Sequence, residues 1–136
     1  MAIKLYSTDD GHVPAWEYHT IKSGTKVAVG LGLAFDATGK LAASLVPTHI
    51  CMVSTADPTV ATTADMVGPV VRITPDQVWE TVNYYELDAE AYPGKKVDLA
   101  EGANYVDANE TTNGNFEVVY SASKEMGDVI RGRFVK

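Results

Sequence analysis

The sequence has little cysteine, a shortage of basic residues and no long apolar run, and each shortage argues against a class of protein. Cys51 is the only cysteine among 136 residues, so no disulfide can form within the chain, and no Cys-x-x-Cys pair indicates a zinc site. Eleven basic residues against eighteen acidic ones leave a formal charge of -7, which argues against a duplex-DNA binder. No stretch approaches the ~18 apolar residues of a membrane span.

The length and the amino terminus predict one domain that is made without export. A chain of 136 residues is well below the ~200 residues beyond which domains usually split. The start, Met-Ala-Ile-Lys-Leu, lacks the basic flank and apolar block of a secretory signal. We expect a single β-rich domain over residues 1–136, with an extended arm over 1–15 and a β body over 16–136.

Alternating apolar residues and abundant Val, Thr and Tyr predict an all-β fold. Many short strands separated by Gly and Pro turns are typical of a small β-barrel or β-sandwich, with at most one short helix. The clearest strand is expected over 26–35, where apolar residues recur at every second position from Val27 to Phe35. The other expected strands are 14–22, an extended segment from 41 onward, 48–54, 67–73, 103–107, 115–121 and 129–135.

The segment 74–84 favours two different structures. Thr74 followed by Pro75 and Gln77 is a good helix start, with a cap, a proline at the first position and a glutamine three residues after the cap. The next residues alternate and are dominated by β-formers, so we predict a strand here. The pair of strands expected around Asn113-Gly114 would be joined by a loop longer than a two-residue hairpin turn.

Candidate catalytic and metal-ligating groups are few. Asp9-Asp10-Gly11-His12 could offer metal ligands, but it also fits an ordinary turn with an exposed histidine, which we favour. Cys51 lies in an apolar run and is expected to be a buried hydrophobe, although strand alternation places it on the same face as His49. We therefore predict no catalytic, cofactor-binding or metal-ligating residues, no cofactor, and a protein that is not an enzyme.

The amino-terminal segment is apolar and β-prone, which leaves two roles open. It can be an inner strand of its own sheet, or an arm that adds to the sheet edge of another chain. The candidate docking residues in this segment are Ile3, Leu5, Tyr6 and Trp16.

Several short motifs resemble the head decoration (capsid cement) proteins of tailed phages. The resemblance spans about residues 15–82, and 127–134 fit the end strand of that family. Residues 83–126 have no match. The motifs are Lys22-Ser-Gly24-Thr-Lys-Val27, Gly30-Leu-Gly-Leu33, Thr38-Gly-Lys-Leu-Ala-Ala-Ser44, Pro47-Thr-His-Ile-Cys-Met52, Val70-Val-Arg-Ile73 and Val78-Trp-Glu-Thr81.

The resemblance implies a structural virion protein, made in the host cytoplasm, that binds the outer capsid surface. Members of that family bind the major capsid protein, often as a homotrimer at threefold or quasi-threefold positions between capsomers, and stabilise the shell. Neither nucleic acid nor a membrane is an expected partner. The alternatives are a carbohydrate-binding or adhesion module, suggested by aromatic residues such as Trp79 and Tyr92, another virion component such as a tail-tube or head–tail joining protein, and a small hydrolase using His12 or His49.

Overall fold

The protein consists of a β-barrel and a β-sheet that pack against each other. The computed structural model describes residues 3–84, 92–122 and 125–135, and these form eleven strands and no helix. The strands are β1 (Lys4–Thr8), β2 (Glu17–Ile21), β3 (Gly32–Phe35), β4 (Leu41–Ala43), β5 (His49–Cys51), β6 (Met66–Arg72), β7 (Gln77–Val82), β8 (Lys96–Leu99), β9 (Val106–Asp107), β10 (Phe116–Ser121) and β11 (Val129–Phe134). The prediction of an all-β fold is confirmed.

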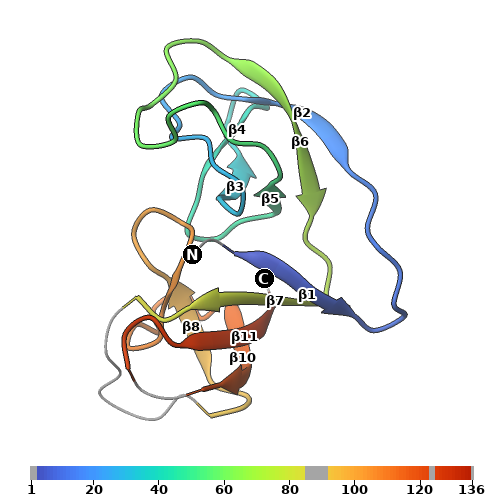
Figure 1. The fold of residues 1–136 in the computed structure, drawn as a ribbon, viewed down its shortest axis with the longest axis vertical. Coiled ribbons are helices and arrows are strands. Elements are labelled where there is room, and N and C mark those ends of the chain that lie inside the picture. The colour runs from blue at the N-terminus through green and yellow to red at the C-terminus, as the bar shows by residue number, and fades with distance from the viewer. Residues whose placement is uncertain (1–2, 85–91, 123–124, 136) are drawn as a thin grey trace.

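Strands β2 to β6 form a closed five-stranded barrel in the order β2-β4-β3-β5-β6. The other strands form a six-stranded sheet in the order β1-β7-β11-β10-β8-β9. In Figure 1 the barrel occupies the upper part of the molecule and the sheet the lower part. Within the described residues no helix is long and apolar enough to cross a membrane.

The two β-structures pack against each other through β5 and β6. Ile50 pairs with Val71 across these strands, and both side chains belong to the core of the six-stranded sheet. Their neighbours Cys51 and Val70 also pair, and both face the core of the barrel. Because successive side chains of a strand point to opposite faces, β5 and β6 contribute side chains to both cores.

The turn from residue 36 to residue 40 joins β3 to β4. Asp36 Oδ1 accepts hydrogen bonds from the Thr38 amide at 2.8 Å and from the Lys40 amide at 3.2 Å. Gly39 takes a φ of +77°, a left-handed conformation that glycine adopts without strain.

The strand expected over 26–35 is shorter in the structure. Only Gly32–Phe35 pairs as β3, because the backbone turns at Gly30, whose φ is +89°. Val27 and Leu31 are nevertheless buried in the barrel core. Val29 and Phe35 of the same alternating set are exposed, so the alternation indicated burial only in part and strand length wrongly.

The strands flanking Asn113-Gly114 do not pair with each other. The earlier strand is only β9, and it pairs with β8, whereas β10 pairs with β8 and β11. The buried Asp98 carboxylate organises the intervening loop by accepting hydrogen bonds from the amides of Asn113 and Gly114, at 2.8 and 2.7 Å from Oδ1.

A strand rather than a helix follows Thr74, as predicted. The cap-like contact still forms, because Gln77 Oε1 accepts a hydrogen bond from the Thr74 amide at 2.8 Å. Gln77 then begins β7, and Trp79 of this strand is paired on both sides, with β1 and with β11. Two strand neighbours satisfy the backbone polar groups that a helix would have satisfied locally.

The expected extended arm over 1–15 is partly folded into the chain's own sheet. β1 pairs antiparallel with β7 at one edge of that sheet, and Ile3 is buried in its core. Residues 4–8 therefore form an edge strand of the chain's own sheet. The following residues, 9–16, connect the sheet to the barrel along the side of the molecule (Figure 1).

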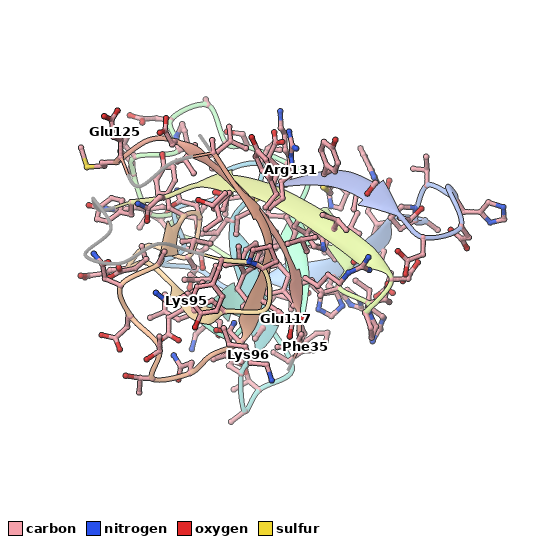
Figure 2. The ribbon with its side chains drawn as sticks, turned by 90° about the horizontal axis from the view of Figure 1, so that it is seen from below. Phe35, Lys95, Lys96, Glu117, Glu125 and Arg131 are labelled. Atoms are coloured by element: carbon pink, nitrogen blue, oxygen red, sulfur yellow. The ribbon has the colours of Figure 1, made fainter. Side chains whose placement is uncertain are left out.

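Charged and aromatic side chains cover the face of the sheet opposite its core. Arg131 binds Glu80 across the strand pair at 2.7 Å, and Glu80 also lies 3.1 Å from Lys4. The Arg131 guanidinium lies 4.0 Å from the centre of the Tyr6 ring and 4.8 Å from that of Tyr120. Figure 2 labels Arg131 in a view from below the sheet.

Candidate functional site

A cluster of polar side chains closes one end of the barrel interior. Strand alternation places Glu17, His19 and Ile21 on one face of β2, and Ile21 belongs to the barrel core. His49 likewise shares a face of β5 with the core residue Cys51. The barrel interior is therefore apolar at one end and carries imidazole and carboxylate groups at the other.

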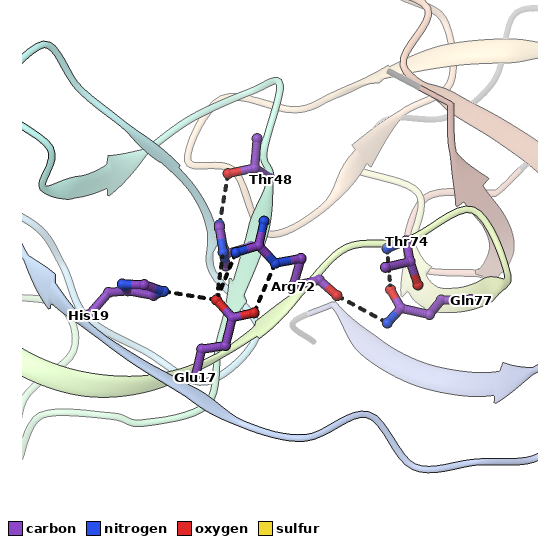
Figure 3. Close-up of polar contacts among 7 residues, drawn as sticks. Glu17, His19, Thr48, Arg72, Thr74 and Gln77 are labelled. Carbon is purple, nitrogen blue, oxygen red and sulfur yellow. Dashed lines mark hydrogen bonds and ion pairs between the residues drawn. The ribbon is translucent and has the colours of Figure 1, made fainter.

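The Glu17 carboxylate is the centre of this cluster (Figure 3). Its Oε1 lies 2.8 Å from His19 Nε2 and 3.4 Å from His49 Nε2. Arg72 holds the carboxylate in a two-point contact, with Nε donating to Oε2 at 2.8 Å and Nη2 donating to Oε1 at 3.1 Å. Such a paired contact fixes the plane of the carboxylate as well as its position.

Phe35 packs against both imidazoles. Its ring centre lies 5.2 Å from that of His19 and 5.3 Å from that of His49, and the two imidazole centres are 5.4 Å apart. All three pairs meet edge to face, which is a favourable arrangement for aromatic rings. The three rings therefore restrain one another.

The charge states within the cluster follow from these contacts. Hydrogen bonds from Arg72 and then from His19 lower the pKa of Glu17 from 4.5 to about 2, so its carboxylate is ionised at neutral pH. Burial, and then the charge of Arg72, lower the pKa of His49 below its usual 6.5, despite the opposing effect of Glu17. His49 is consequently a neutral imidazole at neutral pH.

The donor atoms of the cluster are of the kind that binds transition metals. One carboxylate oxygen of Glu17 and one nitrogen from each of His19 and His49 lie within 4.8 Å of one another. Among the described residues this is the one group of three or more such side chains that close together. Two histidines and a carboxylate are a known ligand set for zinc and for non-haem iron.

The arrangement is less suited to hydrolysis. Thr48 Oγ1 lies 2.8 Å from His49 Nδ1, so a hydroxyl, an imidazole and a carboxylate do follow one another. The lowered pKa of His49 makes it a weak base, and Arg72 already binds the carboxylate. A catalytic base works best with a pKa near the working pH.

The four predicted docking residues have different surroundings. Ile3 is buried in the core of the six-stranded sheet and Leu5 packs against the same core. Tyr6 is exposed beside Arg131 on the outer face of that sheet, and Trp16 is exposed next to the start of β2. The structure does not bring the four together into one surface.

The other residues considered from the sequence have local structural roles. His12 is exposed, and its Nδ1 lies 3.8 Å from Asp10 Oδ2 in the turn after β1. Cys51 is fully buried, burial raises the pKa of its thiol, and Sγ donates to the Val53 carbonyl at 3.2 Å. A thiol in this environment is a poor nucleophile.

Sequence reasoning missed Glu17, His19 and Arg72 as members of a cluster. One signal was available, since Glu17 and His19 are two residues apart in a strand and must share a face. Their meeting with His49 and Arg72 depends on β6 lying between β2 and β5, which the local sequence does not specify. Neither a scan against protein-family models nor a search of curated proteins finds a match for this chain.

Proposed function

We propose that this protein is a structural virion protein that binds the outer surface of a phage capsid at threefold or quasi-threefold positions between capsomers and stabilises the shell. One observation supports this most strongly. The segments that carry the resemblance to head decoration proteins, 18–44, 47–52 and 70–73, contribute to all five strands of one closed barrel. Five of the six motifs therefore fall on one structural unit, while the sixth, 78–81, and the matching end segment, 127–134, lie in β7 and β11 of the sheet.

An apolar strip on the outside of the barrel provides a docking surface. Tyr18 of β2 and Trp16 directly before this strand point outward, because Glu17 between them points inward, and they are 65% and 50% exposed. On the neighbouring strand, Pro69 pairs with Tyr18, and Val67, which is 67% exposed, pairs with Thr20. We call these four residues, Trp16, Tyr18, Val67 and Pro69, the β2–β6 strip.

The β2–β6 strip suits adhesion to another protein for two reasons. Exposed aromatic residues supply much of the binding energy at protein interfaces, and contiguous exposed apolar surface is uncommon on proteins without a partner. Several weak contacts of this kind, made by a multimer that spans more than one capsid subunit, add to a high avidity. Of the residues predicted from the sequence, Trp16 belongs to the strip and Ile3 is unavailable because it is buried.

Capsid binding is the direct test. The purified chain is mixed with expanded and unexpanded shells assembled from the major capsid protein of the same genome, and bound protein is measured by co-sedimentation. We expect binding to the expanded shell and density at its threefold positions in electron micrographs. The double variant Trp16→Ala/Tyr18→Ala should bind at least about tenfold more weakly, since aromatic residues are common hot spots.

Tyr92→Ala is the matched control, because Tyr92 is an exposed aromatic outside the barrel, ahead of β8. It should bind like the unaltered chain. Failure to bind either shell would contradict the proposal. Ring formation by the pure protein would instead favour a tail-tube or head–tail joining protein, and binding on a glycan array would favour a carbohydrate-binding module.

A further inference from the structure

We propose that Glu17, His19 and His49 form a Zn²⁺-binding site at the polar end of the barrel interior. The ligands are Glu17 Oε1 and the Nε2 atoms of the two histidines. This inference does not depend on the capsid proposal, because it concerns only the inside of the barrel.

The spacing of the three atoms is close to what zinc requires. Bonds of about 2.0 Å in a tetrahedron place neighbouring ligand atoms about 3.3 Å apart. Glu17 Oε1 lies 2.8 Å from His19 Nε2 and 3.4 Å from His49 Nε2, and all three atoms lie within 4.8 Å of one another. The distance to His49 is already close to this value, and lengthening the distance to His19 by about half an ångström would match it.

His49 provides an independent indication of a bound cation. Its side chain is 1% exposed, and Nε2 makes no hydrogen bond of good geometry within the described part of the chain, although Glu17 Oε1 is 3.4 Å away. We assign the ring proton to Nδ1, which donates it to Thr48 Oγ1 at 2.8 Å. Nε2 then presents a lone pair towards a carboxylate oxygen, and a cation placed between these two acceptors would satisfy both.

The groups around the ligands have the form of a supporting shell. Hydrogen bonds that orient ligating histidines and carboxylates are a regular feature of zinc sites. Thr48 fills this role for His49, and Arg72 fills it for Glu17 through the bond from Nε to Oε2.

Arg72 is also the main opposing influence. Its Nη2 donates to Glu17 Oε1 at 3.1 Å, and this bond must break when Oε1 binds the metal. The Arg72 side chain is more than half exposed, so the guanidinium has room to turn while Nε keeps its contact with Oε2. Glu17 and Arg72 line a cavity of about 320 Å³ that neither of the two ligand histidines lines, and the side chains of His19 and Glu17 are 30% and 31% exposed, so solvent reaches these two ligands.

The test uses the untagged, metal-free chain titrated with Zn²⁺ by calorimetry and by competition with a chromogenic chelator. We expect one Zn²⁺ per chain and a rise in Tm of several degrees at saturation, because the ion binds only the folded state. His19→Ala and Glu17→Gln should each weaken binding at least about tenfold. His12→Ala is the matched control and should leave binding unchanged, because His12 lies outside the cluster.

A second measurement needs no substitution. The nitrogen NMR signals of the imidazoles should move for His19 and His49 on addition of Zn²⁺ and stay in place for His12. Absence of stoichiometric binding, retained affinity in folded His19→Ala, or signal changes confined to His12 would each overturn the proposal. In that case the cluster has only a structural role, and its hydrogen bonds stabilise one end of the barrel.

Discussion

The barrel and the six-stranded sheet are built from similar strands but filled in different ways. The sheet core contains the large rings of Trp79, Phe116 and Phe134, whereas the barrel core consists of aliphatic and small residues. A barrel of five strands has a narrow interior, since barrel diameter grows with strand number. The aromatic rings of the open sheet belong to the same core as Ile50 of β5 and Val71 of β6.

The two regions also differ in net charge. Residues 17–72, which contain the barrel, have four acidic and four basic residues, so the whole excess of -7 lies in the remaining segments. Within the barrel the charges are largely paired, as in Glu17 with Arg72 and Lys22 with Asp36. Removing charge from the rest of the chain should therefore alter solubility and association more than it alters the barrel.

The largest expected effect tests whether the two regions are one cooperative unit. Ile50→Ala removes a side chain that lies on a barrel strand but packs in the sheet core, and we expect a loss of about 3 kcal/mol in unfolding free energy. Cys51→Ala, on the opposite face of the same strand, should lose only about 1 kcal/mol. Denaturant unfolding measures both changes.

Hydrogen exchange shows which region responds to Ile50→Ala. Because β5 and β6 are common to both cores, amides of β3 in the barrel and of β10 in the sheet should lose protection together. Loss confined to one region would show that the barrel and the sheet unfold independently.

The next largest effect is expected when a glycine is replaced by alanine, and one glycine in each region allows a comparison. A Cβ at Gly132 in the sheet would lie 2.3 Å from the Glu117 carbonyl oxygen and 2.5 Å from Phe116 Cε1, so Gly132→Ala should cost about 2–3 kcal/mol. A Cβ at Gly68 in the barrel meets only side-chain ends, Val53 Cγ1 at 3.0 Å and Ile21 Cδ1 at 3.2 Å. Gly68→Ala should therefore cost less, and equal losses in thermal unfolding would contradict this account.

Acid should weaken both regions through their paired carboxylates. Arg72 lowers the pKa of Glu17 from 4.5 to about 2, and Arg131 lowers the pKa of Glu80 against the opposing effect of burial. A depressed pKa in the folded state gives stability that is present above the unfolded value and is lost as pH falls through the folded value. The free energy of unfolding should therefore decline for Glu17 as pH falls from 4.5 towards about 2.

The variants Glu17→Gln and Glu80→Gln show which carboxylate causes the decline, when their free energies of unfolding are measured across this pH range. Each variant should show a shallower dependence than the unaltered chain. Glu101→Gln, in an exposed turn, serves as the control and should keep the original dependence. A dependence unchanged in both Glu17→Gln and Glu80→Gln would show that other groups cause the loss.

The smallest effect is expected at the barrel surface. Lys40 Nζ lies 2.6 Å from Asp65 Oδ2, but both side chains are exposed, and such pairs contribute little because solvent screens them. Lys40→Ala should leave Tm nearly unchanged. A clear drop in Tm would mean that this pair helps to close the barrel.

Much of the strand content could be predicted from alternation. The expected segments 67–73 and 129–135 correspond closely to β6 and β11, and the segment after Gln77 is a strand as predicted. The prediction failed where the chain bends without losing its apolar pattern, as at Gly30. It also failed in the pairing around Asn113-Gly114, because β8 and β11 occupy the two edges of β10 and β9 pairs with β8 instead.

The amino-acid order alone determined which side chains face inward on each strand, because side chains alternate with a period of two. It placed Glu17 with His19, and His49 with Cys51, on common faces. Only the tertiary structure decided that β6 lies between β2 and β5, which brings these faces together with Arg72 at one end of a closed barrel. Strand order depends on contacts between segments more than fifty residues apart, and no local pattern encodes it.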